Sequence, residues 1–284
     1  MALNVRKFDP TIINSGDNIV MIGKKNTGKS TLIKAMMKKF ENKGACIVIS
    51  DTEISNKSFS GYVGDSYIFD TYTPELLKRI MKRQETAVSR LTREERDANG
   101  RGEITRASLL FIMDDCAFSA KEWNKDPNIK RIFMNGRHFA ITFVLTLQDP
   151  MLIRPALRTN ADWVFLLKDN NYTNRKKLWE HYAGIFPTFD AFNSVMLACT
   201  HDYRCLVVNN RSLSNEIQDV IFWWKAPIYG KFRVGDESYW RNHLRKHNPR
   251  YNEHMQERYE DNFRRTNRPK VRVRLENDAE DMNE

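Results

Sequence analysis

Short, unbroken runs of apolar residues recur along most of this 284-residue chain, and polar or charged residues, glycine and proline separate them. Runs of this kind predict strands that are buried on both faces of a sheet, as in parallel α/β proteins. The predicted strands are residues 18–22, 45–50, 67–69, 109–113, 141–146, 163–167 and 204–208.

Between these runs, apolar residues recur every three or four positions, which predicts amphipathic helices. We predict helices at 31–40, 127–138, 174–184 and 189–198, and a further helix that starts at Pro74. Because strands and helices alternate, we expect an α/β domain with a mainly parallel sheet and helices on both faces. Ligands of such folds bind at the carboxyl ends of the strands.

Charged residues dominate three stretches of the chain. Residues 90–106 mix arginine with glutamate around Gly100 and Gly102, which favours a solvated, mobile loop over a DNA-contacting one. Residues 228–274 carry 13 Lys or Arg against 6 Asp or Glu, interleaved with aromatic residues. That mixture suits contact with nucleic acid phosphates and bases, and equally a helical appendage whose aromatic residues pack on the core.

The last ten residues, 275–284, hold five acidic and no basic residues, which is typical of a disordered tail. We therefore divide the chain into a domain at 1–227, a basic, aromatic-rich helical extension at 228–274, and an acidic tail at 275–284.

The composition narrows the class of protein. Hydrophobic residues make up 41% of the chain, which supports a sizeable core, and the formal charge of +10 is compatible with a polyanionic partner. The four cysteines form no C-x-x-C pair, so we expect buried thiols and no zinc site. No apolar run approaches the ~20 residues that span a bilayer, and the N-terminus is too polar for a secretory signal. We expect a soluble, intracellular protein with no membrane span.

The most specific motif lies between the first predicted strand and the first predicted helix, where the chain fits G-x-x-x-x-G-K-[ST] at every specified position. Backbone N–H groups of such a loop hold polyphosphate at the positive end of a helix. Lys29 would contact the β- and γ-phosphates of ATP, and the Ser30 hydroxyl would ligate Mg²⁺. The predicted nucleotide contacts are Gly23, Lys24, Lys25, Asn26, Thr27, Gly28, Lys29, Ser30 and Thr31.

Two further strands end in polar residues suited to ATP hydrolysis. Asp114 and Asp115 follow the apolar run at 109–113, and a strand that neighbours the loop strand would place Asp114 in the Mg²⁺ shell and Asp115 beside the attacking water. Gln148 follows the run at 141–146, beside the acid-bearing strand, and is a candidate sensor of the γ-phosphate.

These segments, together with Asn135-Gly136-Arg137-His138 and Leu145-Thr146-Leu147-Gln148, resemble the genome-packaging ATPases of nucleocytoplasmic large DNA viruses, of poxvirus type. These enzymes belong to the FtsK/HerA superfamily of P-loop DNA translocases, whose sheet is RecA-like. The resemblance covers residues 8–210. Translocases often carry Glu where Asp115 stands, and the region beyond residue 228 matches no motif.

The resemblance implies an ATP-driven motor that forms a ring of five or six subunits and threads double-stranded DNA into a preformed capsid, with portal or vertex proteins as partners. It places the protein in the host cytoplasm, at the virus factory or on the virion. It also implies an arginine that acts across the subunit interface. Arg137 is the first candidate, and Arg154 and Arg158 are the others.

Three alternative functions share these motifs. A helicase of the same superfamily would separate strands, and a P-loop kinase for a nucleoside or other small molecule would use the second acid or a lid to bind an acceptor. A nucleotide-dependent scaffold would bind ATP without turnover.

Overall fold

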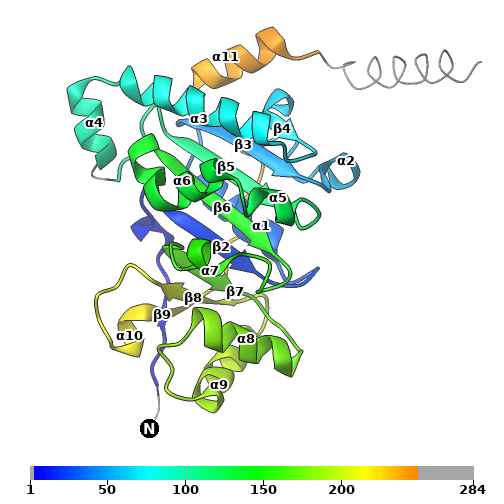
Figure 1. The fold of residues 1–284 in the computed structure, drawn as a ribbon, viewed down its shortest axis with the longest axis vertical. Coiled ribbons are helices and arrows are strands. Elements are labelled where there is room, and N and C mark those ends of the chain that lie inside the picture. The colour runs from blue at the N-terminus through cyan, green and yellow to red at the C-terminus, as the bar shows by residue number, and fades with distance from the viewer. Residues whose placement is uncertain (1–2, 101, 249–284) are drawn as a thin grey trace, which may run out of the picture. The chain divides into compact units, whose positions relative to one another are not determined.

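The computed structural model describes residues 3–100 and 102–248, which form a nine-stranded sheet with helices on both of its faces (Figure 1). The strands are β1 Arg6–Lys7, β2 Asn18–Ile22, β3 Ala45–Ser50, β4 Ile68–Phe69, β5 Leu109–Asp114, β6 Ile141–Leu147, β7 Trp163–Leu166, β8 Cys205–Asn209 and β9 Ile221–Trp224. The α-helices are α1 Lys29–Lys38, α2 Glu53–Asn56, α3 Pro74–Ser89, α4 Arg93–Gly100, α5 Ala120–Trp123, α6 Pro127–Asn135, α7 Pro155–Arg158, α8 Tyr172–Tyr182, α9 Phe189–Cys199, α10 Ile217–Val220 and α11 Glu237–Lys246. The 3-10 turns are η1 Pro10–Ile12, η2 Asp65–Tyr67 and η3 Gly136–Phe139.

The strands lie in the order β1-β9-β8-β7-β2-β6-β5-β3-β4. All neighbouring strands are parallel except at β7–β8 and β8–β9, so the predicted mainly parallel α/β sheet is confirmed. The antiparallel β8 brings the connection before Cys205 to the carboxyl end of β7, next to the end of β2.

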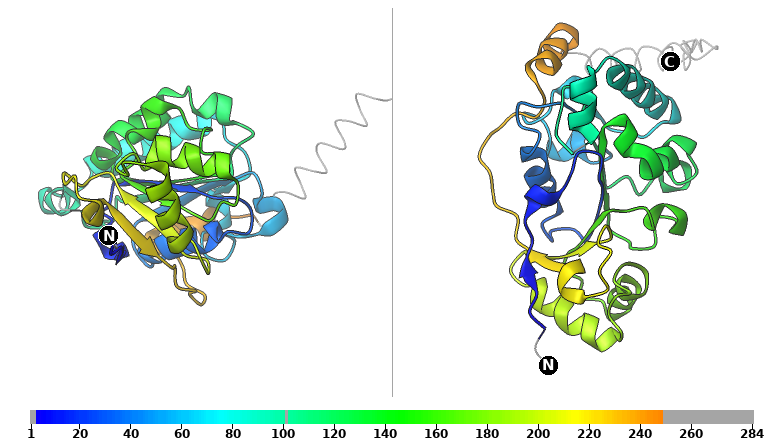
Figure 2. Two further views of the ribbon diagram at one scale, coloured as in Figure 1. Left: turned by 90° about the horizontal axis from the view of Figure 1, so that it is seen from below. Right: turned by 90° about the vertical axis from the view of Figure 1, so that its left-hand side faces the viewer.

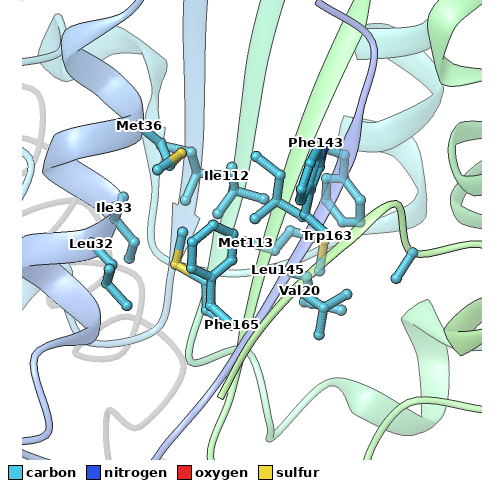
Figure 3. Close-up of a cluster of buried hydrophobic side chains, with 14 of the residues drawn as sticks. Val20, Leu32, Ile33, Met36, Ile112, Met113, Phe143, Leu145, Trp163 and Phe165 are labelled. Carbon is cyan, nitrogen blue, oxygen red and sulfur yellow. The ribbon is translucent and has the colours of Figure 1, made fainter. Parts of the chain in front are cut away.

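The core fills both faces of the sheet because the central strands are apolar on both sides, as expected for parallel strands. Figure 3 shows Leu32, Ile33 and Met36 of α1 pointing towards one face. Phe133 of α6 packs edge-on against Phe143 of β6 on the other, with ring centroids 5.3 Å apart. Figure 2 gives two further views of these layers.

Residues 90–106 were predicted to form a mobile loop, and this prediction is wrong for the helix α4. A capping box starts the helix: the Thr92 hydroxyl accepts from Glu95 N–H at 3.2 Å, and the Glu95 carboxylate accepts from Thr92 N–H at 3.2 Å. The T-x-x-E spacing is a sequence signal for this helix start. The high density of charged residues around it favoured a loop instead.

The chain divides into two compact units, Met1–Arg245 and Lys246–Glu284. Phe232, Val234 and Tyr239, which follow the predicted domain limit at residue 227, are buried in the core of the first unit. Residues 249–274 of the predicted extension and the tail at 275–284 lie outside the described residues. All four cysteines are buried free thiols, as predicted. Among the described residues, no helix is both long enough and apolar enough to cross a membrane.

Candidate active site

The phosphate loop connects β2 to α1 at the carboxyl edge of the sheet. Gly28 caps α1 with a left-handed backbone, φ 104°, which glycine adopts without strain. Within the part of the chain that the structure describes, the backbone N–H groups of residues 24–28 find no hydrogen-bond acceptor. Consecutive free amides at a helix N-terminus form a cradle for an anion such as a phosphate chain.

Gly23 leaves no room for a side chain. A Cβ atom built there would lie 2.7 Å from both Leu167 Cβ and Thr27 Oγ1. The Thr27 hydroxyl donates to Lys24 C=O at 2.7 Å and holds the loop closed on itself. The glycine is therefore required by packing as well as by approach of the ligand.

Lys29 bends back over the loop, where its Nζ donates to the carbonyls of Gly23 at 2.5 Å and Lys24 at 2.9 Å. Burial lowers the pKa of this ammonium, and the charges of Asp115 and Asp114 act in the opposite direction. The Lys29 ammonium thus lies at the phosphate loop, within electrostatic reach of the two acids, where it can bind the β- and γ-phosphates.

The hydroxyl of Thr146 on β6 joins the two acids. It donates to Asp114 Oδ1 at 2.6 Å and accepts from the backbone N–H of Asp115 at 3.0 Å. Asp115 has a left-handed backbone, φ 53°, so it turns out of β5 just after Asp114. This turn directs the Asp115 carboxylate away from β5, the strand that positions Asp114.

Gln148 lies one residue beyond β6 and donates from Nε2 to both carboxylate oxygens of Asp115, each at 2.6 Å. The structure therefore brings together Lys29, Asp114, Asp115 and Gln148, as the sequence predicted for a hydrolytic site. Their catalytic roles stay predictions.

The predicted neighbour relation between the loop strand and the acid-bearing strand is wrong, because β6 lies between β2 and β5. The order of the strands cannot be read from local sequence patterns, because it depends on contacts between distant segments. Thr146 lies on the inserted strand and Gln148 directly follows it, so this strand orients both acids beside the phosphate loop.

Asp114 suits a hard cation. Its carboxyl is buried, and burial raises its pKa, with the Thr146 hydrogen bond opposing this shift and Asp115 adding to it. No group of three or more His, Cys, Asp or Glu side chains within residues 3–100 and 102–248 could hold a metal alone. Mg²⁺ commonly takes one or two protein oxygens together with phosphate and water. The Asp114 carboxylate and the Ser30 hydroxyl fit that pattern. Ser30 lies in the first turn of α1.

The three candidate arginines lie in different places. Arg137 is at the opposite edge of the sheet from the phosphate loop, where a Cβ on Gly16 would lie 2.6 Å from Arg137 Cα. Arg158 is buried, with its guanidinium 5.4 Å from the ring centre of Tyr182. Arg154 is exposed, and its backbone N–H donates to Asn124 Oδ1 at 3.0 Å. Arg137 is therefore not part of the site of its own subunit.

Two contacts at the site escaped the sequence analysis. Lys24 forms an ion pair with the buried Asp169 at 2.9 Å, which ties the phosphate loop to the segment after β7. No motif marks Asp169. The bridging role of Thr146 is likewise invisible until β5 and β6 are known to be neighbours.

A phosphate cradle, a lysine, a buried carboxylate and a Gln-bound second carboxylate on a mainly parallel sheet define a P-loop ATPase. The chain belongs to the family described as Poxvirus A32 protein, whose model matches residues 6–169.

Relatives from large DNA viruses cover most of the chain. The uncharacterized protein L437 of Acanthamoeba polyphaga mimivirus is 36% identical over 245 residues, which are 86% of this chain and 84% of that protein. The uncharacterized protein 015R of Frog virus 3 is 34% identical over 80% of this chain and 67% of its own length. The recognised resemblance to packaging ATPases of such viruses is thereby confirmed.

Solved structures share the fold. The DNA-packaging ATPase B204 of Sulfolobus turreted icosahedral virus has a TM-score of 0.51 at 19% identity, covering 76% of this chain and 100% of its own. The pCW3 conjugation coupling protein TcpA with ATPγS has a TM-score of 0.52 at 11% identity, covering 82% of this chain and 71% of its own. These similarities support the P-loop ATPase fold.

Proposed function

We propose that this ATPase is a double-stranded DNA translocase that packages a viral genome into a capsid. The proposal depends on the contact between Gln148 and Asp115 beside the phosphate loop. This contact orients a carboxylate that is suited to activate a water molecule. Membership of the Poxvirus A32 family supports the viral setting. The shared fold of B204, a packaging ATPase, supports the packaging role.

Each residue of the site has a separate role in the hydrolysis of ATP. The loop amides and Lys29 hold the phosphate chain and neutralise its charge. Asp115 accepts the proton of the water that attacks the γ-phosphorus, while the bond to the β-phosphate oxygen breaks and ADP leaves. Gln148 orients Asp115 and the water. When bound to Asp114 and Ser30, Mg²⁺ supplies charge stabilisation to the phosphate oxygens.

In this proposal, five or six subunits form a ring. An arginine of each subunit completes the active site of the next one. Arg137 serves only a neighbour's site, since its own phosphate loop is at the opposite edge of the sheet. Arg154 is the exposed alternative. The ring works in the host cytoplasm, at the virus factory or on the virion, with portal or vertex proteins of the capsid as partners.

DNA is gripped through its phosphates in this proposal. The exposed side of α3 carries Lys78, Arg79 and Lys82, which suit phosphate contact without base reading. Binding is then insensitive to sequence. Its affinity falls about 10³-fold or more between roughly 50 and 200 mM salt if about six or more phosphates are contacted.

The test is phosphate release with and without long duplex DNA, with Lys29→Ala as the inactive control. We expect DNA to raise the rate of the wild-type protein, and a rate unaffected by DNA would reject the motor. No phosphate release at all would favour the scaffold. Sizing with an ATP analogue and DNA separates a ring from a monomeric or dimeric kinase, and a strand-separation assay identifies a helicase.

A further inference from the structure

The direction in which ATP lies across the phosphate loop follows from the strand order. Asp115 and Gln148 follow β5 and β6, on one side of β2, and they define the γ-phosphate end of the site. A nucleotide held by the loop must therefore extend its ribose and base to the other side of β2. On that side lie β7 and β8.

Tyr203 lies at this other side. It precedes β8, whose Leu206 pairs with Leu166 at the carboxyl end of β7. A Cβ atom built on Gly28 would lie 3.7 Å from Tyr203 Cδ1 and 4.0 Å from Leu167 Cδ2. The tyrosine ring is thus in van der Waals reach of the phosphate loop, opposite the acids.

The loop before β8 holds this ring in solvent. Asp202 and Tyr203 both have left-handed backbones, φ 54° and 57°, a conformation that residues other than glycine adopt rarely and with strain. The Asp202 carboxylate pairs with Lys225 at 2.6 Å, and Arg204 N–H donates to His201 C=O at 3.1 Å. Tyr203 remains 69% exposed, although a large aromatic side chain gains by burial.

A strained turn that presents an aromatic ring beside a phosphate cradle is suited to a ligand with a flat apolar face. We propose that Tyr203 is the platform on which the base of the bound nucleotide stacks. The inference rests on the ATP site described above. Stacking is tolerant of base identity because every base has a π-face. Purine nucleotides, with the larger face, therefore bind more tightly than pyrimidine nucleotides, with little choice between adenine and guanine.

The test measures binding of MgATP and of inorganic tripolyphosphate, which lacks a base, to the full chain. Tyr203→Ala should weaken MgATP binding by about 5- to 100-fold, the range for loss of one base–aromatic stack. Tripolyphosphate binding should not change. Tyr203→Phe keeps the ring and should bind both ligands as the wild type does.

Tyr229→Ala is the matched control, because Tyr229 is another partly exposed tyrosine, beside Lys38 at the far end of α1. It should leave both affinities unchanged. Wild-type affinity of Tyr203→Ala for MgATP would overturn the proposal, and so would an equal loss of both ligands, which indicates a damaged loop. If MgATP and tripolyphosphate respond as predicted but DNA is not moved, the stacking inference stands and the translocase proposal fails.

Discussion

The side-chain amide of Gln148 donates to both carboxylate oxygens of Asp115, and both distances are 2.6 Å. A group at the end of β6 therefore orients a carboxylate that follows β5. Because β6 also pairs directly with the loop strand β2, one strand contacts both halves of the site. A change at the γ-phosphate would reach Asp115 through this strand end.

Asp115→Asn should retain ATP and fail to hydrolyse it. The amide cannot accept the proton of the attacking water, and loss of a general base costs about 10²- to 10⁴-fold in rate. Phosphate release gives the rate, and equilibrium nucleotide binding gives the affinity. Normal hydrolysis by this variant would remove Asp115 from its assigned role.

Gln148→Ala should lower kcat by about 10²-fold or more with little change in ATP affinity, as for loss of a single preorganised donor. Gln148→Glu is the sharper variant, since it places a second carboxylate against Asp115. An ionised glutamate cannot donate to Asp115 and repels its carboxylate, so this variant should lose at least as much activity as Gln148→Ala. Steady-state rates at saturating ATP compare the two variants. An equal rise in the ATP dissociation constant would instead assign Gln148 to ground-state binding.

Asp114→Asn should make the protein more stable and inactive. Burial raises the pKa of the Asp114 carboxyl, so its folded state binds a proton more readily than the unfolded state does. Its contribution to stability is complete below the unfolded value, about 3.9, and is lost as pH rises through the raised folded value. The neutral amide avoids that loss at neutral pH. Thermal unfolding at pH 7, in the absence of Mg²⁺ and nucleotide, should give a higher Tm for the variant, and a lower Tm would contradict this account.

Thr146→Val should cost about 1–3 kcal/mol in unfolding free energy, because it leaves the buried Asp114 carboxyl and the Asp115 N–H without their partner. The Thr146 hydrogen bond lowers the pKa of Asp114, so its removal raises that pKa further. The acid limb of the pH–rate profile should then move to higher pH. Thr146→Ser retains the hydroxyl, so its pH profile should be that of the wild type, and its unfolding free energy should fall only by about 1 kcal/mol for the buried methyl.

Much of the fold was predictable from local pattern. The limits of β2 and β3 agree with the predicted strands at 18–22 and 45–50, because buried parallel strands are continuous apolar runs. Thr73 and Pro74 begin α3 as predicted, with the Thr73 hydroxyl accepting from Leu76 N–H at 3.2 Å. The phosphate loop was predictable because its chemistry requires fixed residue types at fixed spacing.

The features of the fold and the site that the sequence did not predict depend on contacts between distant segments. The position of β6 between β2 and β5, and with it the role of Thr146, is set by tertiary packing. The same holds for the pairing of Lys24 with Asp169, whose residues are far apart in the sequence. The exposed position of Tyr203 beside Gly28 follows from the antiparallel direction of β8, which an apolar run alone does not reveal.

Displacement of a third strand from a triplex on long duplex DNA tests the central claim most directly, because it reports movement along intact duplex. We expect the wild-type protein to displace the third strand in the presence of MgATP, at a rate that follows its ATP hydrolysis. Asp115→Asn should bind the same DNA and displace nothing. Hydrolysis of ATP by the wild-type protein on this DNA without any displacement would contradict the account.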